Sequence, residues 1–163
     1  MLRILAISGI LFCFSCQNST RWTKVSFIQG SPELIQVKQE ESQIYKGDGT
    51  GFVAHLTDTD ENMVGILTGW LITVDVKDDN LEDGQDLEER IGTMVFDLGN
   101  DNEIVVIGGN TIHHRQEQPK EGFSQKRAIV GGTGIYKGIT GETISTRNPD
   151  GTYLHEMEYV LPH

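Results

Sequence analysis

Cysteine is scarce in this chain of 163 residues, and both copies, Cys13 and Cys16, fall within the first sixteen positions. The rest of the chain therefore has no internal disulfide and no cysteine nucleophile. Its stability has to come from packing, and a chain of this length is long enough to bury one hydrophobic core.

Basic residues are also few, 13 against 24 acidic ones, which gives a net charge of −11. Removal of residues 1–16 would take away Arg3 and change the net charge to −12. An acidic surface repels nucleic acid and anionic lipid headgroups, so we expect neither as a direct partner. Solubility at the cell surface is the simplest explanation of the acidity.

Long hydrophobic runs are missing except near the start, where an apolar stretch from Ile4 to Phe14 follows one basic residue. This stretch is too short to span a bilayer, so we interpret residues 1–16 as a secretory signal peptide. Its end resembles the lipobox of bacterial lipoproteins. The resemblance implies that Cys16 is lipidated and becomes the first mature residue, while plain cleavage near Ser15 is the alternative.

The signal predicts an exported protein, either a cell-envelope lipoprotein or a secreted one, in contact with the membrane only through the N-terminal lipid. Residues 17–22 are interpreted as a short polar tether, and residues 23–163 as a single domain.

Helical heptads and tandem repeats are absent from that domain, whereas short runs of β-branched residues alternate with turn sequences. Asn148-Pro-Asp-Gly151 is typical of a hairpin turn, and an acidic loop is expected at 77–89. The spacing predicts an all-β fold, an eight-stranded antiparallel β-barrel. The expected strands cover residues 25–28, 50–56, 64–76, 93–98, 103–114, 125–130, 135–146 and 153–161.

The segment 127–141 is rich in glycine and joins two of these strands. Glycine at positions 131, 132 and 134 permits positive φ and close backbone approach, which favours a turn or bulge at the barrel rim. A phosphate-binding loop is not favoured, because no helix follows and the Gly-Lys-Ser/Thr order is missing.

The strand expected at 64–76 is apolar on both faces, since Trp70, Ile72 and Val74 alternate with Leu67 and Leu71. One face of a strand in an isolated barrel should be polar and solvated. We therefore expect a partner, a helix or a long loop over the outer face, and a homo-oligomer, dimer or trimer, is the preferred explanation because no candidate helix is present.

Several motifs resemble the allene oxide cyclases and dirigent proteins, which share one eight-stranded barrel. Val130-Gly-Gly-Thr-Gly-Ile-Tyr-Lys-Gly138 is similar to a dirigent glycine segment, and Glu156-Met-Glu-Tyr-Val-Leu161 to the closing strand of that family. Gly47-Asp48, Phe52 and Val64-Gly-Ile66 are similar to cyclase segments. The resemblance implies the barrel fold and chemistry that needs no cofactor.

The catalytic residues of the cyclases are not carried over. Their pocket cysteine falls at Leu71 and their pocket asparagine at Ala54, and neither side chain can polarise a substrate. Allene oxide cyclisation itself is therefore not expected, and the catalytic residues stay unknown.

If Leu71 and Ala54 face the interior, strand alternation places further side chains beside them, to give an apolar wall with one hydroxyl. Such a wall either binds a small hydrophobic ligand or simply fills the barrel, and both alternatives stay open. Tyr159, on the strand at 153–161, belongs either to a pocket mouth or to a solvated face. The candidate pocket residues are Phe52, Ala54, Leu56, Leu67, Leu71, Thr73 and Tyr159.

No metal site is expected. His113 and His114 are adjacent on a strand and point to opposite faces, so they cannot converge with Glu117 on one ion. The sequence thus leaves three functions open: a barrel that guides cyclisation or isomerisation of a bound molecule, an envelope protein that only binds such a molecule, and a structural oligomer.

Overall fold

The computed structural model describes residues 21–41, 43–78, 86–113 and 118–162. The residues interpreted as a signal peptide, with Cys16, and the expected tether up to position 20 lie outside this part of the chain, as do His114 and Glu117. Within the described ranges, no helix has the length and apolar character needed to cross a membrane.

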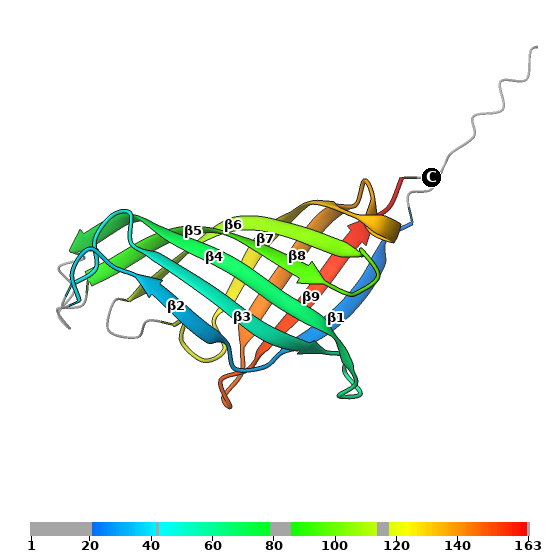
Figure 1. Cartoon of the computed structure of the whole chain (residues 1–163), viewed down its shortest axis with the longest axis horizontal. Helices are drawn as coiled ribbons and strands as arrows, with labels where there is room; N and C mark the ends of the chain where they lie inside the picture. Colours follow the sequence, from blue (N-terminus) through cyan, green and yellow to red (C-terminus); the bar gives the residue numbers. More distant parts are fainter. Residues whose placement is uncertain (1–20, 42, 79–85, 114–117, 163) are drawn as a thin grey trace, which may run out of the picture.

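The described chain folds into nine strands and one short 3-10 turn, η2 (Gly134–Tyr136) (Figure 1). The strands are β1 (Thr23–Gln29), β2 (Glu33–Val37), β3 (Gly49–Thr57), β4 (Met63–Asp78), β5 (Asp86–Asp97), β6 (Glu103–His113), β7 (Ser124–Gly132), β8 (Thr140–Arg147) and β9 (Tyr153–Val160).

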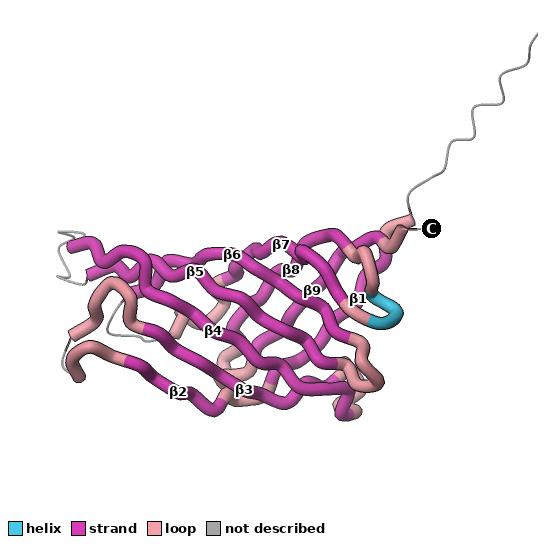
Figure 2. Tube along the Cα trace, turned by 45° about the horizontal axis from the view of Figure 1, so that its top comes forward, coloured by secondary structure: helices cyan, strands magenta, loops and turns pink. Residues whose placement is uncertain are grey.

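Each of the strands β3 to β8 pairs antiparallel with the next strand along the chain, and β9 also pairs with β1. The sheet closes where Ile28 and Gln29 of β1 pair with Thr57 and Leu56 of β3. β2 continues along the other part of β3, so β1 and β2 together occupy one of eight places around the barrel. The predicted eight-stranded antiparallel barrel is confirmed (Figure 2).

The interior divides into two halves along the barrel axis. The hydrophobic core fills the end of the barrel where β1 begins and β9 ends, and we call this part the apolar half. Its buried side chains come from seven strands and from the residue just before β8. These residues are Phe27, Leu56, Leu67, Met94, Phe96, Ile104, Val106, Ile129, Ile139, Met157 and Tyr159. In the other half, the inward positions of the same strands are mostly polar, and we call it the polar half.

The wall is incompletely hydrogen-bonded in the polar half. β6 and β7 pair only from Ile104–Gly132 to Ile107–Ala128, although both strands continue beyond this point. Val105 pairs with Gly131 and Val106 with Ile129, so Val130 is the extra residue of a bulge in β7. The predicted bulge at the glycine segment is therefore present, but of the three glycines expected to have positive φ only Gly134 does.

Three elements differ from expectation. The strand expected at 135–146 begins only at Thr140, because the chain forms the 3-10 turn η2 before it. β5 begins at Asp86, so Glu88 and Glu89 belong to a strand and not to the acidic loop predicted at 77–89. β2 was not predicted at all, because its five residues are all exposed and show no buried alternation.

The outer face of β4 is apolar, as the alternation predicts. Trp70 is 40% exposed, and Ile72 and Val74 beside it are also exposed. The indole of Trp70 lies across Gly49 and Gly51 of β3, where an added Cβ would come within 2.5 and 2.8 Å of the ring. Within the described chain the rest of this face is uncovered.

Candidate functional site

A cavity of about 90 Å³ opens in the polar half of the barrel. One ordered water needs roughly 10–15 Å³ on the same measure, so this space holds more than isolated solvent. The barrel is therefore neither wholly filled nor wholly open, because the apolar half is packed and the polar half contains the cavity.

The cavity has two chemically different walls. Apolar side chains, chiefly Phe52, Leu71 and Met94, come from the consecutive strands β3, β4 and β5. Across the barrel, polar side chains come from β1, β6, β7, β8 and β9, together with Arg90 of β5. These are Gln29, Asn110, Gln125, Arg127, Ser145, Tyr153 and His155.

His155 lies at the base of the polar wall and is only 1% exposed. Its Nε2 lies 2.9 Å from Oε1 of Gln29, and its Nδ1 lies 2.8 Å from Oγ of Ser145. A carbonyl oxygen only accepts, so Nε2 carries the proton and the Ser145 hydroxyl donates to Nδ1. Burial, and secondarily the nearby Arg127 guanidinium, lowers the pKa of His155 to about 3, so the ring is neutral.

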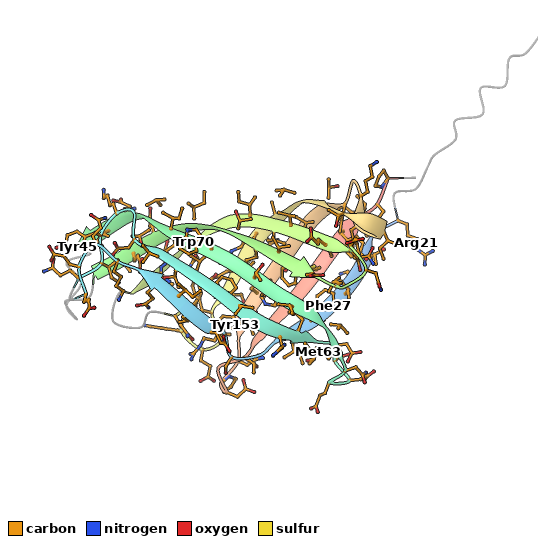
Figure 3. The ribbon with its side chains drawn as sticks, in the orientation of Figure 1. Arg21, Phe27, Tyr45, Met63, Trp70 and Tyr153 are labelled. Carbon is orange, nitrogen blue, oxygen red and sulfur yellow. The ribbon has the colours of Figure 1, made fainter. Side chains whose placement is uncertain are left out.

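Aromatic rings fix the orientation of this imidazole. Phe96 meets it edge-on, with ring centroids 5.1 Å apart, and Tyr153 stacks on it at 6.4 Å. Phe96 belongs to the apolar half and Tyr153 to the cavity wall, so His155 stands at the boundary between the two. Figure 3 shows Tyr153 farther than Phe27 from the barrel end at which the chain's ends lie.

Arg127 of β7 is 6% exposed and projects into the cavity wall. Its Nη2 donates to Oε1 of Gln125 and, at 3.5 Å, to Oδ1 of Asn110 across the unpaired part of the β6–β7 seam. Gly108 makes room for the side chain, since a Cβ there would stand 2.8 Å from Cγ of Arg127. Burial lowers the pKa of Arg127 to about 10, so the guanidinium remains charged at neutral pH.

Two buried donors in this wall reach no acceptor in the described chain, Nε of Arg127 and Nε2 of Gln125. The amide orientation of Gln125 follows from chemistry, because a guanidinium only donates and must face the carbonyl oxygen. The amide nitrogen is consequently turned elsewhere. Both side chains line the cavity, where a bound acceptor would lie beside them.

A second buried cation, Arg90, is paired. Its Nη2 donates to Oε2 of Glu88 at 2.7 Å, and the Thr73 hydroxyl donates to the other carboxylate oxygen. Glu88 is almost completely buried, so this network satisfies a carboxylate that would be costly to bury alone.

The sequence-predicted pocket residues divide between the two halves. Phe52 and Leu71 line the cavity. Thr73 is buried beside it and bonds Glu88. The other four candidates, Ala54, Leu56, Leu67 and Tyr159, are buried in the packed part of the barrel.

The expectation of an apolar wall with one hydroxyl is wrong for the polar half, whose charged and amide side chains were not predicted. Alternation on β9 had placed Tyr153, His155 and Tyr159 on one face, and the structure turns this face inward. Of the two alternatives for this face, the solvated one is therefore wrong. In the described ranges, no three His, Cys, Asp or Glu side chains gather into a possible metal site.

Comparison with known proteins supports the fold. No family model and no curated protein matches the sequence. The structure is similar to a pyocyanin demethylase, with a TM-score of 0.64 and 19% identity over 85% of this chain and 100% of that one. It is also similar to the Diels Alderase AbmU from Streptomyces koyangensis (0.60, 14% identity, 90% of this chain, 72% of that one).

A pterocarpan synthase dirigent protein is a third similar structure, with a TM-score of 0.53 and 17% identity over 85% of this chain and 83% of that one. At such identities the likeness shows the fold alone. The chain is thus a closed barrel that is similar in fold to a Diels Alderase and a dirigent protein, with one half packed and the other hollow.

Proposed function

We propose that the protein binds a small, largely hydrophobic molecule in the polar half of the barrel and guides its cyclisation or isomerisation without a cofactor. The observation that carries this proposal is the cavity itself, in which an apolar wall faces hydrogen-bond donors fixed by their neighbours. The similarity to a Diels Alderase and a dirigent protein supports a reaction governed by substrate conformation.

The apolar wall supplies orientation. Phe52, Leu71 and Met94 contact a hydrocarbon chain or ring without directional bonds, so the shape of the cavity selects folded conformers of the substrate. A [4+2] ring closure requires no oxidant or reductant, because three π bonds become one π bond and two σ bonds. Restricting the substrate to a reactive conformer is the main contribution that such a wall makes.

The polar wall supplies electrostatic stabilisation. Arg127 Nε and Gln125 Nε2 can donate to a substrate oxygen and withdraw electron density from a conjugated system attached to it. Their positions are set by the contacts among Arg127, Gln125 and Asn110, so little reorganisation is needed when the reaction proceeds.

A binding protein without catalysis is the second candidate, and the state of the ionisable groups favours it. Both ring nitrogens of His155 are engaged inside the protein, and the pKa of this residue is far below neutral. The Glu88 carboxylate is held by Arg90 and Thr73. Neither group is placed to transfer a proton, and binding alone needs none.

Native mass spectrometry of the protein purified from its own host tests the proposal. We expect the wild type to retain a small molecule and Met94→Trp to lose it, because the larger side chain fills the cavity. Met63→Trp is the matched control, since Met63 is exposed at the start of β4 and does not line the cavity. Equal retention by all three proteins would contradict the proposal.

The same experiment separates the two candidates. The released molecule is added to fresh protein, together with the fraction that contains its biosynthetic precursor. Formation of the product is followed by chromatography. Conversion that Met94→Trp abolishes supports catalysis. Retention without conversion supports the binding protein.

We further propose that the outer face of β4 is covered by a second copy of the chain. Trp70, Ile72 and Val74, together with Ile91 of β5 and Val53 of β3, form an exposed patch without charged members. Two copies of an acidic protein repel each other least where such a patch meets itself.

Trp70→Asp should convert the oligomer to monomers, because it buries an unpaired charge in the interface. Sedimentation velocity measures the change. Trp22→Asp is the control, because Trp22 is also exposed but lies outside the patch, just before β1. An unchanged sedimentation profile for Trp70→Asp would exclude this interface.

A further inference from the structure

Resting on the proposed function, we infer that the cavity selects molecules that carry an anionic oxygen, a carboxylate, phenolate or enolate, and that Arg127 and Gln125 bind this oxygen. The inference names the class of ligand and the two side chains that distinguish it from a neutral molecule of the same shape. It follows from how charge is arranged inside the polar half.

The two arginines that line the cavity, Arg90 and Arg127, differ in their ion pairing. Arg90 forms an ion pair with Glu88. Arg127 contacts only neutral amide oxygens, those of Gln125 and Asn110, and no carboxylate of the described chain lies within ion-pair distance of it. A buried cation without a counter-charge is costly, and an entering anion would remove part of that cost.

The free donors point to the same class of ligand. Nε of Arg127 and Nε2 of Gln125 are buried without an acceptor in the described chain, while the Nη2 contact holds the two side chains together. A carboxylate or enolate oxygen accepts from several donors at once, and bonds that involve two charged partners are the stronger ones.

The electrostatic potential at the polar wall also favours an anionic ligand. The nearby Arg127 charge is the second cause, after burial, of the lowered pKa of His155, so the positive potential extends along the polar wall. The apolar wall then receives the hydrocarbon part of the same molecule.

The test uses trans-cinnamate and cinnamamide, which differ chiefly in the charge of one end group, in titrations followed by calorimetry at neutral pH. We expect the wild type to bind cinnamate at least about tenfold more tightly than the amide. Arg127→Gln should reduce this preference to within about twofold and leave the affinity for the amide nearly unchanged. Arg127→Lys, which keeps the charge but loses Nε, should retain an intermediate preference.

Lys126→Gln is the matched control. Lys126 is the preceding residue, points outward and pairs with Glu142 at the surface, so the variant changes the net charge equally without touching the cavity. It should keep the full preference for cinnamate. A wild-type measurement makes the test independent of variant folding: cinnamate, but not cinnamamide, should shift the Nε–H resonance of Arg127, assigned through its couplings within the wild-type side chain.

The outcomes separate the two proposals. Equal binding of both probes by the wild type, or an unchanged preference in Arg127→Gln, would overturn the anion inference and leave the proposed function standing. Failure of the wild type to bind either probe at millimolar concentration would count against both.

Discussion

The apolar and polar halves of the barrel are built from the same strands, yet they use their inward positions in opposite ways. On β9, Met157 and Tyr159 pack in the core, whereas Tyr153 and His155 line the cavity. On β7, Ile129 is core, and Arg127 and Gln125 are cavity wall. One half therefore stabilises the barrel through packing, and the other keeps polar groups that packing alone would not require.

Phe96→Ala should give the largest loss of stability, because Phe96 is completely buried and contacts Phe27 and His155. We expect a decrease of about 4 kcal/mol in the free energy of unfolding. Phe52→Ala, the same substitution at the cavity wall, should cost about half as much, since Phe52 is only half-buried. Urea denaturation measures both, and equal losses would remove the distinction between the halves.

Glu88→Ala should cost about 3 kcal/mol, because it removes a buried carboxylate that both the Arg90 guanidinium and the Thr73 hydroxyl contact. Glu89→Ala is the control, since Glu89 pairs with Lys77 at the surface and should contribute less than about 1 kcal/mol. Similar effects for the two variants would mean that the buried network of the polar half is no more important to stability than a surface pair.

A smaller effect should appear as a pH dependence from His155. Its pKa is about 3 in the folded protein and about 6.5 when unfolded, so only the unfolded chain gains this proton as the pH falls below 6.5. Stability should decrease by up to about 1.4 kcal/mol per pH unit between roughly pH 6 and pH 4.

Urea denaturation at pH 7, 6 and 5 measures this slope. His155→Gln should flatten it, because the variant has no imidazole at this buried position. Carboxylates with lowered pKa values, such as those of Asp58 and Asp150, act at lower pH and do not obscure the window. A slope that persists in His155→Gln would show that the imidazole is not buried in its neutral form.

The sequence could predict the barrel because its signals are local. β-branched alternation and turn chemistry at 148–151 need no knowledge of distant residues, and the turn has the expected form, with Gly151 at positive φ. β2 lacked such a signal. Its residues face solvent, and its pairing with β3 depends on the path of β1 before it.

The polar half could not be predicted for a physical reason. In the run Gln125, Arg127, Ile129, a strand that turns its polar residues toward a cavity has the same pattern as one that turns them toward water. Glu88 was misplaced for the same reason, because an acidic run resembles a solvated loop until the partners of each carboxylate are known. Only the three-dimensional structure brings Arg90 and Thr73 to that carboxylate.

The indole of Trp70, which lies flat over two glycines of β3, restricts the order in which this surface can change during evolution. A side chain gained first at Gly49 or Gly51 would collide with the ring, since its Cβ would approach to 2.5 or 2.8 Å. Loss of the tryptophan first removes the obstacle. Homologous barrels without an aromatic residue at position 70 should therefore be the ones that carry larger residues at 49 and 51, and lineages should show the tryptophan replaced before the glycines.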